Sequence, residues 1–370
     1  MPDQAPRTLL GGQTQLDVRS IERELMQLWR DAAEESDGER ATVTRTCVLN
    51  LLVVAPPDYD ATTTIARLTD ALPSRAIVIS ADPQAPDENE PQLDAWVQAH
   101  CQLPAAGRPQ VCCEQITLTA RGAGIGRVPG TILPLLLPDV PVAVWFPNGA
   151  PFDNALFRRL AAMSDRMIVD SRTFGNNIHD VARLATMDDG MPALADLVWG
   201  RLTLWREQLA QCFDAPALTA RLAEAETLTV VAAPDSNQVA AYLLAGWLAS
   251  RLGWNNPLRG EHGQIVMQRE GGQVQIAIQA GQRALPAHMS IERLSLGCVG
   301  VSANIELSGD ERLVTSTEVT GRPALRRSVR LPQRDIADLL ADELRLPVSD
   351  PTYVAALRAA LQLLTTAQPG

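Results

Sequence analysis

Residues 121–151 read RGAGIGRVPGTILPLLLPDVPVAVWFPNGAP, which combines three closely spaced glycines, an apolar run and the adjacent aromatic residues Trp145 and Phe146. A glycine-rich turn that leads into a helix offers free backbone N–H groups and a favourable dipole to an anion, so this stretch could cradle a phosphate. Glycine and proline also fix tight turns, so the same stretch could instead shape a surface. The features of the whole chain decide between these two hypotheses.

The glycines do not fit the known phosphate-binding motifs. The dinucleotide-binding pattern G-x-G-x-x-G, read from Gly122, requires a glycine where Arg127 stands. A Walker A loop requires a lysine, and this chain has none, because all 32 of its basic residues are arginines. An enzyme or sensor that binds a phosphosugar or nucleotide through the Gly-Arg loop 121–130 is therefore kept as the alternative hypothesis.

The first half of the chain alternates strand-like and helix-like segments. Continuous apolar runs rich in β-branched residues are typical of strands buried on both faces, and alternating runs indicate a hairpin. The expected strands are 44–55, 76–80, 141–146 and 166–171, the expected helices are 60–72 and 152–162, and 93–101 is expected to pair with 110–120 in a hairpin.

The second half changes from helical to alternating patterns. Residues 191–213 carry apolar side chains at spacings of three and four, which predicts one helix, and a second long helix is expected at 236–253. From residue 263 onward, short alternating runs separated by turn residues predict an antiparallel meander. Helices at 333–345 and 350–366 are expected to cover one face of this sheet.

These segments predict an α/β and α+β protein with an N-terminal mixed α/β sheet domain, followed by a second domain with an antiparallel sheet covered by helices. Residues 1–41 are expected to form an N-terminal helical arm around a helix at 14–35. The α/β domain is expected at 42–172. The α+β domain, with the antiparallel meander and the C-terminal helices, is expected at 173–370.

Composition argues against several functions. The formal net charge of -11 disfavours nucleic acid, which needs clustered positive charge. No signal-like segment is found, and prolines interrupt the longest apolar stretch at 128–147, so we expect a soluble, cytoplasmic protein without a membrane partner. The six cysteines and four histidines lack metal-ligand spacing, so no metal is expected. No cofactor is expected either, because the dinucleotide-binding and Walker A motifs are absent.

Four segments resemble a known family. They are PLLLPDVPVAVWF, ALFRRLAAMSDRMIVDSRTF, LVWGRLTLWREQLAQCFD and AGWLASRLGW, in this order. Together they look like OpcA, the glucose-6-phosphate dehydrogenase assembly protein of cyanobacteria and other bacteria, over about residues 44–300. The resemblance implies a non-catalytic assembly factor and allosteric activator. Such a protein binds glucose-6-phosphate dehydrogenase and promotes its active oligomer in the oxidative pentose phosphate pathway, and it brings no catalytic or cofactor-binding residues.

The resemblance favours the surface-shaping hypothesis for residues 121–151. Aromatic and arginine side chains commonly anchor protein interfaces, so the partner-interface candidates are Arg121, Arg127, Trp145 and Phe146. A core role for Trp145 is equally open. Asp170 and Ser171 are further candidates, because they end a strand at the sheet edge where ligands gather in α/β folds.

Overall fold

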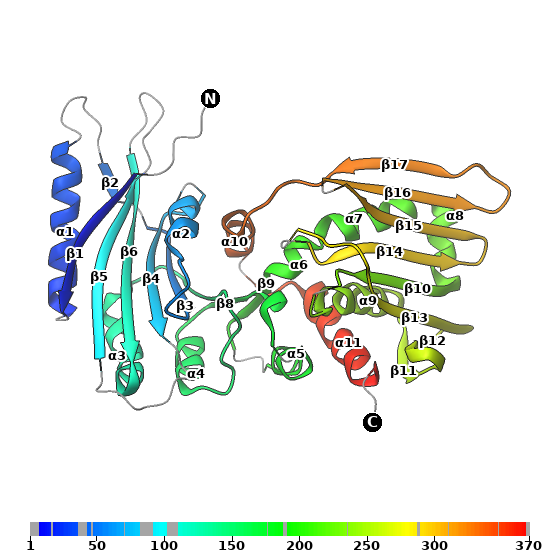
Figure 1. Cartoon of the computed structure of the whole chain (residues 1–370), viewed down its shortest axis with the longest axis horizontal. Helices are drawn as coiled ribbons and strands as arrows, with labels where there is room; N and C mark the ends of the chain where they lie inside the picture. Colours follow the sequence, from blue (N-terminus) through cyan, green and yellow to red (C-terminus); the bar gives the residue numbers. More distant parts are fainter. Residues whose placement is uncertain are drawn as a thin grey trace. The chain divides into compact units, whose positions relative to one another are not determined.

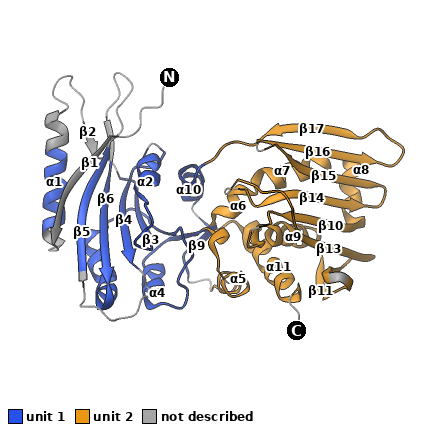
Figure 2. Ribbon diagram, viewed as in Figure 1, with its two compact units in different colours: residues 1–169, 190–195, 335–348 blue, residues 170–189, 196–334, 349–370 orange. Residues whose placement is uncertain are grey.

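The computed structural model describes residues 7–15, 18–35, 43–45, 47–69, 71–81, 92–101, 110–175, 177–187, 191–234, 236–286, 289–309, 311–346 and 348–367. The chain forms two compact units (Figures 1 and 2). Unit 1 contains Met1–Val169, Gly190–Ala195 and Asp335–Val348, and unit 2 contains Asp170–Asp189, Asp196–Arg334 and Ser349–Gly370. Each unit is therefore assembled from segments that are far apart in the sequence.

Unit 1 is built on one sheet. Its strands are β1 (Arg7–Gln15), β2 (Val43–Arg45), β3 (Leu49–Ala55), β4 (Ser74–Ala81), β5 (Gln92–Cys101), β6 (Gln110–Arg121), β7 (Val142–Phe146), β8 (Arg166–Val169) and β9 (Ala193–Asp196). The strand order is β1-β5-β6-β4-β3-β7-β8-β9, with β2 beside β6. The helices of the unit are α1 (Val18–Glu35), α2 (Thr62–Leu68), α3 (Val128–Ile132), α4 (Ala155–Ala162) and α10 (Ile336–Leu344).

The centre of this sheet is parallel. β6, β4, β3, β7 and β8 pair in parallel, whereas the hairpin strands β5 and β6 pair antiparallel. All seven residues of β3 are buried, because helical layers cover parallel sheets on both faces. The strands expected at 76–80 and 141–146 and the hairpin of 93–101 with 110–120 are confirmed.

The helix expected at 14–35 forms as α1 and packs on β1 and β5. The helical arm expected at residues 1–41 is wrong in part, because residues 7–15 form β1, a strand that pairs with β5. Its buried Ile21 and Leu25 contribute to the core. Polar contacts complete the docking: the Glu22 carboxylate accepts a hydrogen bond from the Arg75 guanidinium at 2.7 Å, and the Trp29 indole N–H donates to the Glu114 carboxylate at 2.9 Å. The helix is therefore an integral layer of unit 1.

Unit 2 is built on a second sheet. Its strands are β10 (Ala225–Ala232), β11 (Asn255–Arg259), β12 (Ile265–Arg269), β13 (Gly272–Ala280), β14 (Ile291–Cys298), β15 (Val301–Ser308), β16 (Arg312–Val319) and β17 (Leu325–Arg330). Its helices are α5 (Asn177–Ala185), α6 (Leu197–Arg201), α7 (Thr203–Cys212), α8 (Pro216–Thr219), α9 (Val239–Leu252) and α11 (Pro351–Ala367). The strand order is β11-β12-β13-β10-β14-β15-β16-β17.

The expected meander is interrupted at one point. β10 inserts between β13 and β14, pairing parallel with the first and antiparallel with the second, while the other pairs are antiparallel. Helices α7, α9 and α11 contact the sheet, and α9 also packs closely on α11. A side chain at Gly246 of α9 would overlap the backbone of Ala356 and Ala360, so glycine is required for this close helix pair.

Two helix predictions are wrong. Residues 191–213 form the short strand β9 followed by α6 and α7, because Asp196 ends the strand and caps α6 by accepting a hydrogen bond from the Val198 N–H. The helix expected at 333–345 forms as α10 but packs against α2 in unit 1, not on the sheet of unit 2. The Arg166 guanidinium holds the α10 segment by donating to Glu343 at 3.1 Å and to the Leu346 carbonyl at 2.9 Å.

We expect Glu114→Gln to lower the free energy of unfolding by about 3 kcal/mol, because it removes the fully buried carboxylate that pairs with the buried Arg75 guanidinium. Urea titration followed by circular dichroism measures the change. Arg67→Ala is the control, since the Arg67 side chain pairs with Asp335 while 54% exposed. Exposed pairs contribute at most about 1 kcal/mol. Equal losses in the two variants would contradict the role of the buried pair.

Candidate functional site

The carboxyl ends of β3 and β7 form the first candidate site. In open parallel sheets, ligands bind outside the strand ends at the point where the strand order reverses. In unit 1 the chain leaves β3 toward β4 and later returns to β7 on the other side of β3, so the reversal lies between β3 and β7. This is the edge at which a dinucleotide-binding protein holds its pyrophosphate.

The residues at this edge do not suit a phosphate. β3 is followed by Pro56 and Pro57, which have no backbone N–H to donate, and by the acidic residues Asp58 and Asp60. The Asp60 carboxylate accepts a hydrogen bond at 2.8 Å from the Thr62 N–H, at the first turn of α2. The chain's own carboxylate therefore occupies the helix end that attracts the phosphate in dinucleotide-binding folds.

The glycine-rich stretch takes a helical course between β6 and β7. Gly122–Arg127 forms a 3₁₀ turn, α3 follows, and Leu133–Leu135 forms a second 3₁₀ turn. Gly122 has a φ of 52°, a left-handed conformation that glycine adopts without strain. The structure therefore agrees with the tight turn and short helix expected here.

Two buried side chains of the central strands hold the end of this stretch by hydrogen bonds to its backbone. The Arg75 guanidinium donates to the Leu135 carbonyl at 2.8 Å. The Asn50 side chain forms a reciprocal pair with Leu137, donating to its carbonyl at 3.0 Å and accepting from its N–H at 2.9 Å. These contacts fix the backbone of the stretch, so the side chains that point outward are held on a rigid support.

Three outward side chains define the 121–133 surface: Arg121, Arg127 and Leu133. Both arginines are exposed, and within the described part of the chain neither has an ion-pair partner. Leu133 is 61% exposed, which is unusual for a large apolar side chain on a rigid turn. Sequence reasoning found the two arginines but missed Leu133, because an apolar run does not reveal which of its members faces outward.

Trp145 and Phe146 belong to the core of unit 1. Their exposed fractions are 1% and 0%. The Trp145 ring meets the edge of Tyr59 with centroids 6.0 Å apart, and the Phe146 ring packs on Phe157 at 5.3 Å. Their candidacy for a partner interface is corrected, and the core role left open for Trp145 is confirmed, because both lie on a strand covered on both faces.

Asp170 and Ser171 lie in a buried polar cluster of unit 2. The two carboxylate oxygens of Asp170 each accept a hydrogen bond at 3.0 Å from Arg201, and Arg172 adds a contact at 3.4 Å. Asn237 donates from its side chain to the carbonyls of Ser171 at 2.7 Å and of Arg172 at 3.1 Å. Asp170 and Ser171 are only 2% and 1% exposed, so neither forms part of an open surface.

Asp196 completes this cluster. Its carboxylate accepts hydrogen bonds from the N–H groups of Ser171 at 3.1 Å and Val198 at 2.9 Å and from the Tyr353 hydroxyl at 3.3 Å. Burial raises the pKa of Asp196 to about 6, and the nearby negative charge of Asp170 adds to the rise. Sequence reasoning missed Asp196, although an Asp directly before an apolar helical run is a recognisable capping signal.

The described residues offer little for acid–base or metal chemistry. No cluster of three or more His, Cys, Asp or Glu side chains among them could hold a metal ion. Burial lowers the pKa of His100, which shares a 2.8 Å hydrogen bond with the Gln115 side chain inside unit 1. None of the described helices is both long and apolar enough to cross a bilayer.

Family models match most of the chain. One model, described as the N-terminal domain of a glucose-6-phosphate dehydrogenase subunit, matches residues 66–186. A second model, described as the C-terminal domain of the same kind of subunit, matches residues 192–357. The matches therefore cover strands and helices of both units.

Curated relatives carry a corresponding name. A protein named "Putative OxPP cycle protein OpcA" from Nostoc punctiforme is 34% identical over 203 residues, which cover 54% of this chain and 42% of the relative. A Synechocystis protein of the same name is 32% identical over 199 residues, covering 54% of this chain and 41% of the relative. The matched segment thus spans about two fifths of the length of these relatives.

A solved structure shares the fold. The crystal structure of an oxidoreductase from Sinorhizobium meliloti superposes with a TM-score of 0.51 at 11% sequence identity, covering 87% of this chain and 97% of the other. At this identity the likeness concerns the fold alone.

Asp196 yields a prediction for the pH dependence of stability. Its folded pKa of about 6 lies above the ordinary value of 3.8, so between these values the folded state retains a proton that the unfolded state releases. This contribution to stability is complete below the unfolded pKa and is lost as the pH rises through the folded pKa. The Asp196→Asn side chain cannot ionise and does not lose this contribution. The free energy of unfolding of the variant, relative to that of the wild type, should therefore increase from about pH 4 to about pH 7.

Urea unfolding of both proteins across this range measures the difference. Because Asn keeps one carbonyl oxygen as an acceptor for the N–H groups of Ser171 and Val198, the cap is retained. A constant difference between variant and wild type at all pH values would show that Asp196 does not carry the raised pKa.

Proposed function

Because this chain belongs to the OpcA family of glucose-6-phosphate dehydrogenase subunits, we propose that it binds that dehydrogenase and promotes its active oligomer without catalysing a reaction itself. The observation that carries the proposal is the pair of family matches, which extend over residues 66–186 and 192–357. The proposed role lies in the oxidative pentose phosphate pathway, and a cytoplasmic location fits such a partner.

Activation by a non-catalytic partner has a simple thermodynamic basis. A protein that binds the active form of an oligomer more tightly than the inactive form shifts the population by the difference in its two affinities. No residue of the activator needs to touch the substrate. The requirement is a surface that recognises one form of the dehydrogenase.

We propose the 121–133 surface as the part of unit 1 that makes this contact. Arginine is enriched among the residues that dominate binding energy, and an exposed apolar side chain at the centre of a contact gains from burial. Arg127 and Leu133 have these properties, and the anchoring of the stretch by Asn50 and Arg75 means that little order has to be gained on binding.

The alternative of nucleotide or phosphosugar binding through loop 121–130 receives less support. The fold contains the strand-order reversal at which dinucleotides bind elsewhere, but the adjoining loop carries Pro56, Pro57, Asp58 and Asp60. Carboxylates repel a phosphate, and prolines offer no donors. These residues therefore disfavour nucleotide binding at this edge.

Leu133→Asp should weaken activation of the cognate dehydrogenase, because it places a charge at the centre of the proposed contact, and a loss of more than about 1 kcal/mol of binding energy is expected. The concentration of this protein that gives half-maximal activation measures the effect. Leu258→Asp is the matched control, since Leu258 is 60% exposed on β11 of unit 2 and Leu133 is 61% exposed.

Arg127→Glu should weaken activation in the same direction while circular dichroism remains unchanged. If Leu133→Asp and Leu258→Asp activate equally well, the 121–133 surface is not the contact. If the wild type neither changes the kinetics of the dehydrogenase nor forms a complex with it, the proposed function itself is wrong.

The isolated chain should show no saturable binding of NADP in the micromolar range. The reason is the negative charge and the missing N–H donors at the end of β3. Isothermal titration calorimetry checks this expectation, with a dinucleotide-binding dehydrogenase as the positive control. A stoichiometric binding isotherm would restore the alternative function.

A further inference from the structure

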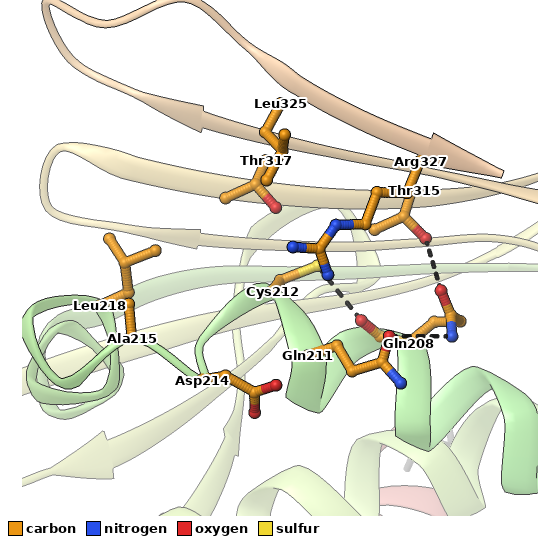
Figure 3. A pocket seen from close by; sticks show the side chains of 10 residues that line it. All are labelled: Gln208, Gln211, Cys212, Asp214, Ala215, Leu218, Thr315, Thr317, Leu325 and Arg327. Atoms are coloured by element: carbon orange, nitrogen blue, oxygen red, sulfur yellow. Dashed lines mark hydrogen bonds between the residues drawn. The ribbon is translucent and has the colours of Figure 1, made fainter.

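A polar pocket opens on unit 2 between the end of α7 and the strands β16 and β17 (Figure 3). Its volume is about 160 Å³. Gln208, Gln211 and Cys212 line it from α7, Thr315 and Thr317 from β16, and Arg327 from β17. This volume is below the ~300–1,000 Å³ of pockets for drug-sized ligands, so its occupant would be a small molecule.

The floor of the pocket is a fixed hydrogen-bond network. The Thr315 hydroxyl donates to the Gln208 side-chain carbonyl at 3.3 Å, and the Gln208 amide donates to Gln211 at 3.3 Å. The Cys212 thiol donates to the Gln208 backbone carbonyl at 3.2 Å. Gln208, Thr315 and Thr317 are only 5–7% exposed, so the polar floor is held in place before any ligand arrives.

The rim carries groups whose binding capacity is not used within the protein. The Arg327 side chain reaches from β17 toward α7, and its guanidinium lies near Cys212 (Figure 3). Among the described residues the Arg327 side chain has no hydrogen-bond or ion-pair partner, and neither has the Asp214 carboxylate. Arg327 and Asp214 therefore both line this small pocket without pairing with each other.

This combination fits one class of ligand. A guanidinium binds an oxyanion through a planar pair of donors. A carboxylate accepts hydrogen bonds from hydroxyl groups, and the amide of Gln211 can donate to them. Leu218 and Leu325 complete the lining with apolar surface suited to carbon-bound hydrogens.

We propose that the α7–β16 pocket binds a small hydroxylated metabolite that carries an oxyanion, either a phosphate ester or a carboxylate. Arg327 holds the oxyanion, Asp214 and Gln211 bind the hydroxyl groups, and the Gln208 network fixes the floor. This site goes beyond the proposed dehydrogenase partnership and does not depend on it, because all of its groups belong to unit 2 of this chain.

The test is a calorimetric titration of the full chain, without any dehydrogenase, using three probes of matched size. Glycerol 3-phosphate carries a phosphate ester, glycerate carries a carboxylate, and glycerol carries neither. We expect saturable one-to-one binding of at least one anionic probe and none of glycerol. Binding of one anion alone identifies the oxyanion that the site prefers.

Arg327→Ala should weaken this binding by about 10-fold or more, because a charge-assisted hydrogen bond is lost. Arg326→Ala is the matched control: Arg326 is also exposed and precedes Arg327 on β17, so its side chain points to the opposite face of the sheet. The Arg326→Ala variant should bind the anionic probes with the affinity of the wild type. Thr317→Val, which removes a hydroxyl from the wall, should also weaken binding.

The proposal is overturned if neither anion binds saturably at millimolar concentration, or if glycerol binds as well as the anions. It is equally overturned if Arg326→Ala and Arg327→Ala lose the same affinity, since that would indicate diffuse attraction to the arginine-rich strand. Circular dichroism of both variants confirms that the fold is intact.

Discussion

The buried ion pair between Arg75 and Glu114 is the constraint on which unit 1 depends. The Arg75 Nε–H and Nη–H groups approach the Glu114 carboxylate at 2.7 Å, and both side chains are almost fully excluded from water. Charges in such a position are costly unless every hydrogen-bonding group is satisfied. The remaining hydrogen-bond partners of Arg75 and Glu114 come from α1 and from the 121–151 stretch. The helix, the sheet and this stretch therefore stabilise one another.

The sheet edge of unit 1 differs from that of a dinucleotide-binding protein. The parallel sheet of unit 1 keeps the strand order that creates a ligand edge, but the edge itself carries prolines and carboxylates. The backbone at the end of the ordered turns at residues 122–135 and just after it is held instead by Arg75, at Leu135, and by Asn50, at Leu137. A fold does not determine function, and here the prolines and carboxylates at the strand ends argue against binding of a dinucleotide at this edge.

Much of the fold followed from local patterns, and the failures have identifiable causes. The buried strands β3 and β7 and the hairpin of β5 and β6 were predictable because apolar runs and alternation are local signals. β9 was missed because its four residues precede a helix and share its apolar spacing. The packing of α10 in unit 1 depends on Arg166, 177 positions from Glu343, and no local pattern encodes that contact. For the same reason the sequence revealed the arginines of the 121–133 surface, but it left the burial of Trp145 undecided and did not reveal that of Phe146.

Hydrogen–deuterium exchange of this protein, alone and with its cognate glucose-6-phosphate dehydrogenase, tests the central claim most directly. If the 121–133 surface docks on the dehydrogenase, the amides from Arg121 to Leu137 should gain protection in the complex while those of the buried strand β3 remain unchanged. Added protection confined to unit 2, or no added protection at any saturating concentration of the dehydrogenase, would contradict the account.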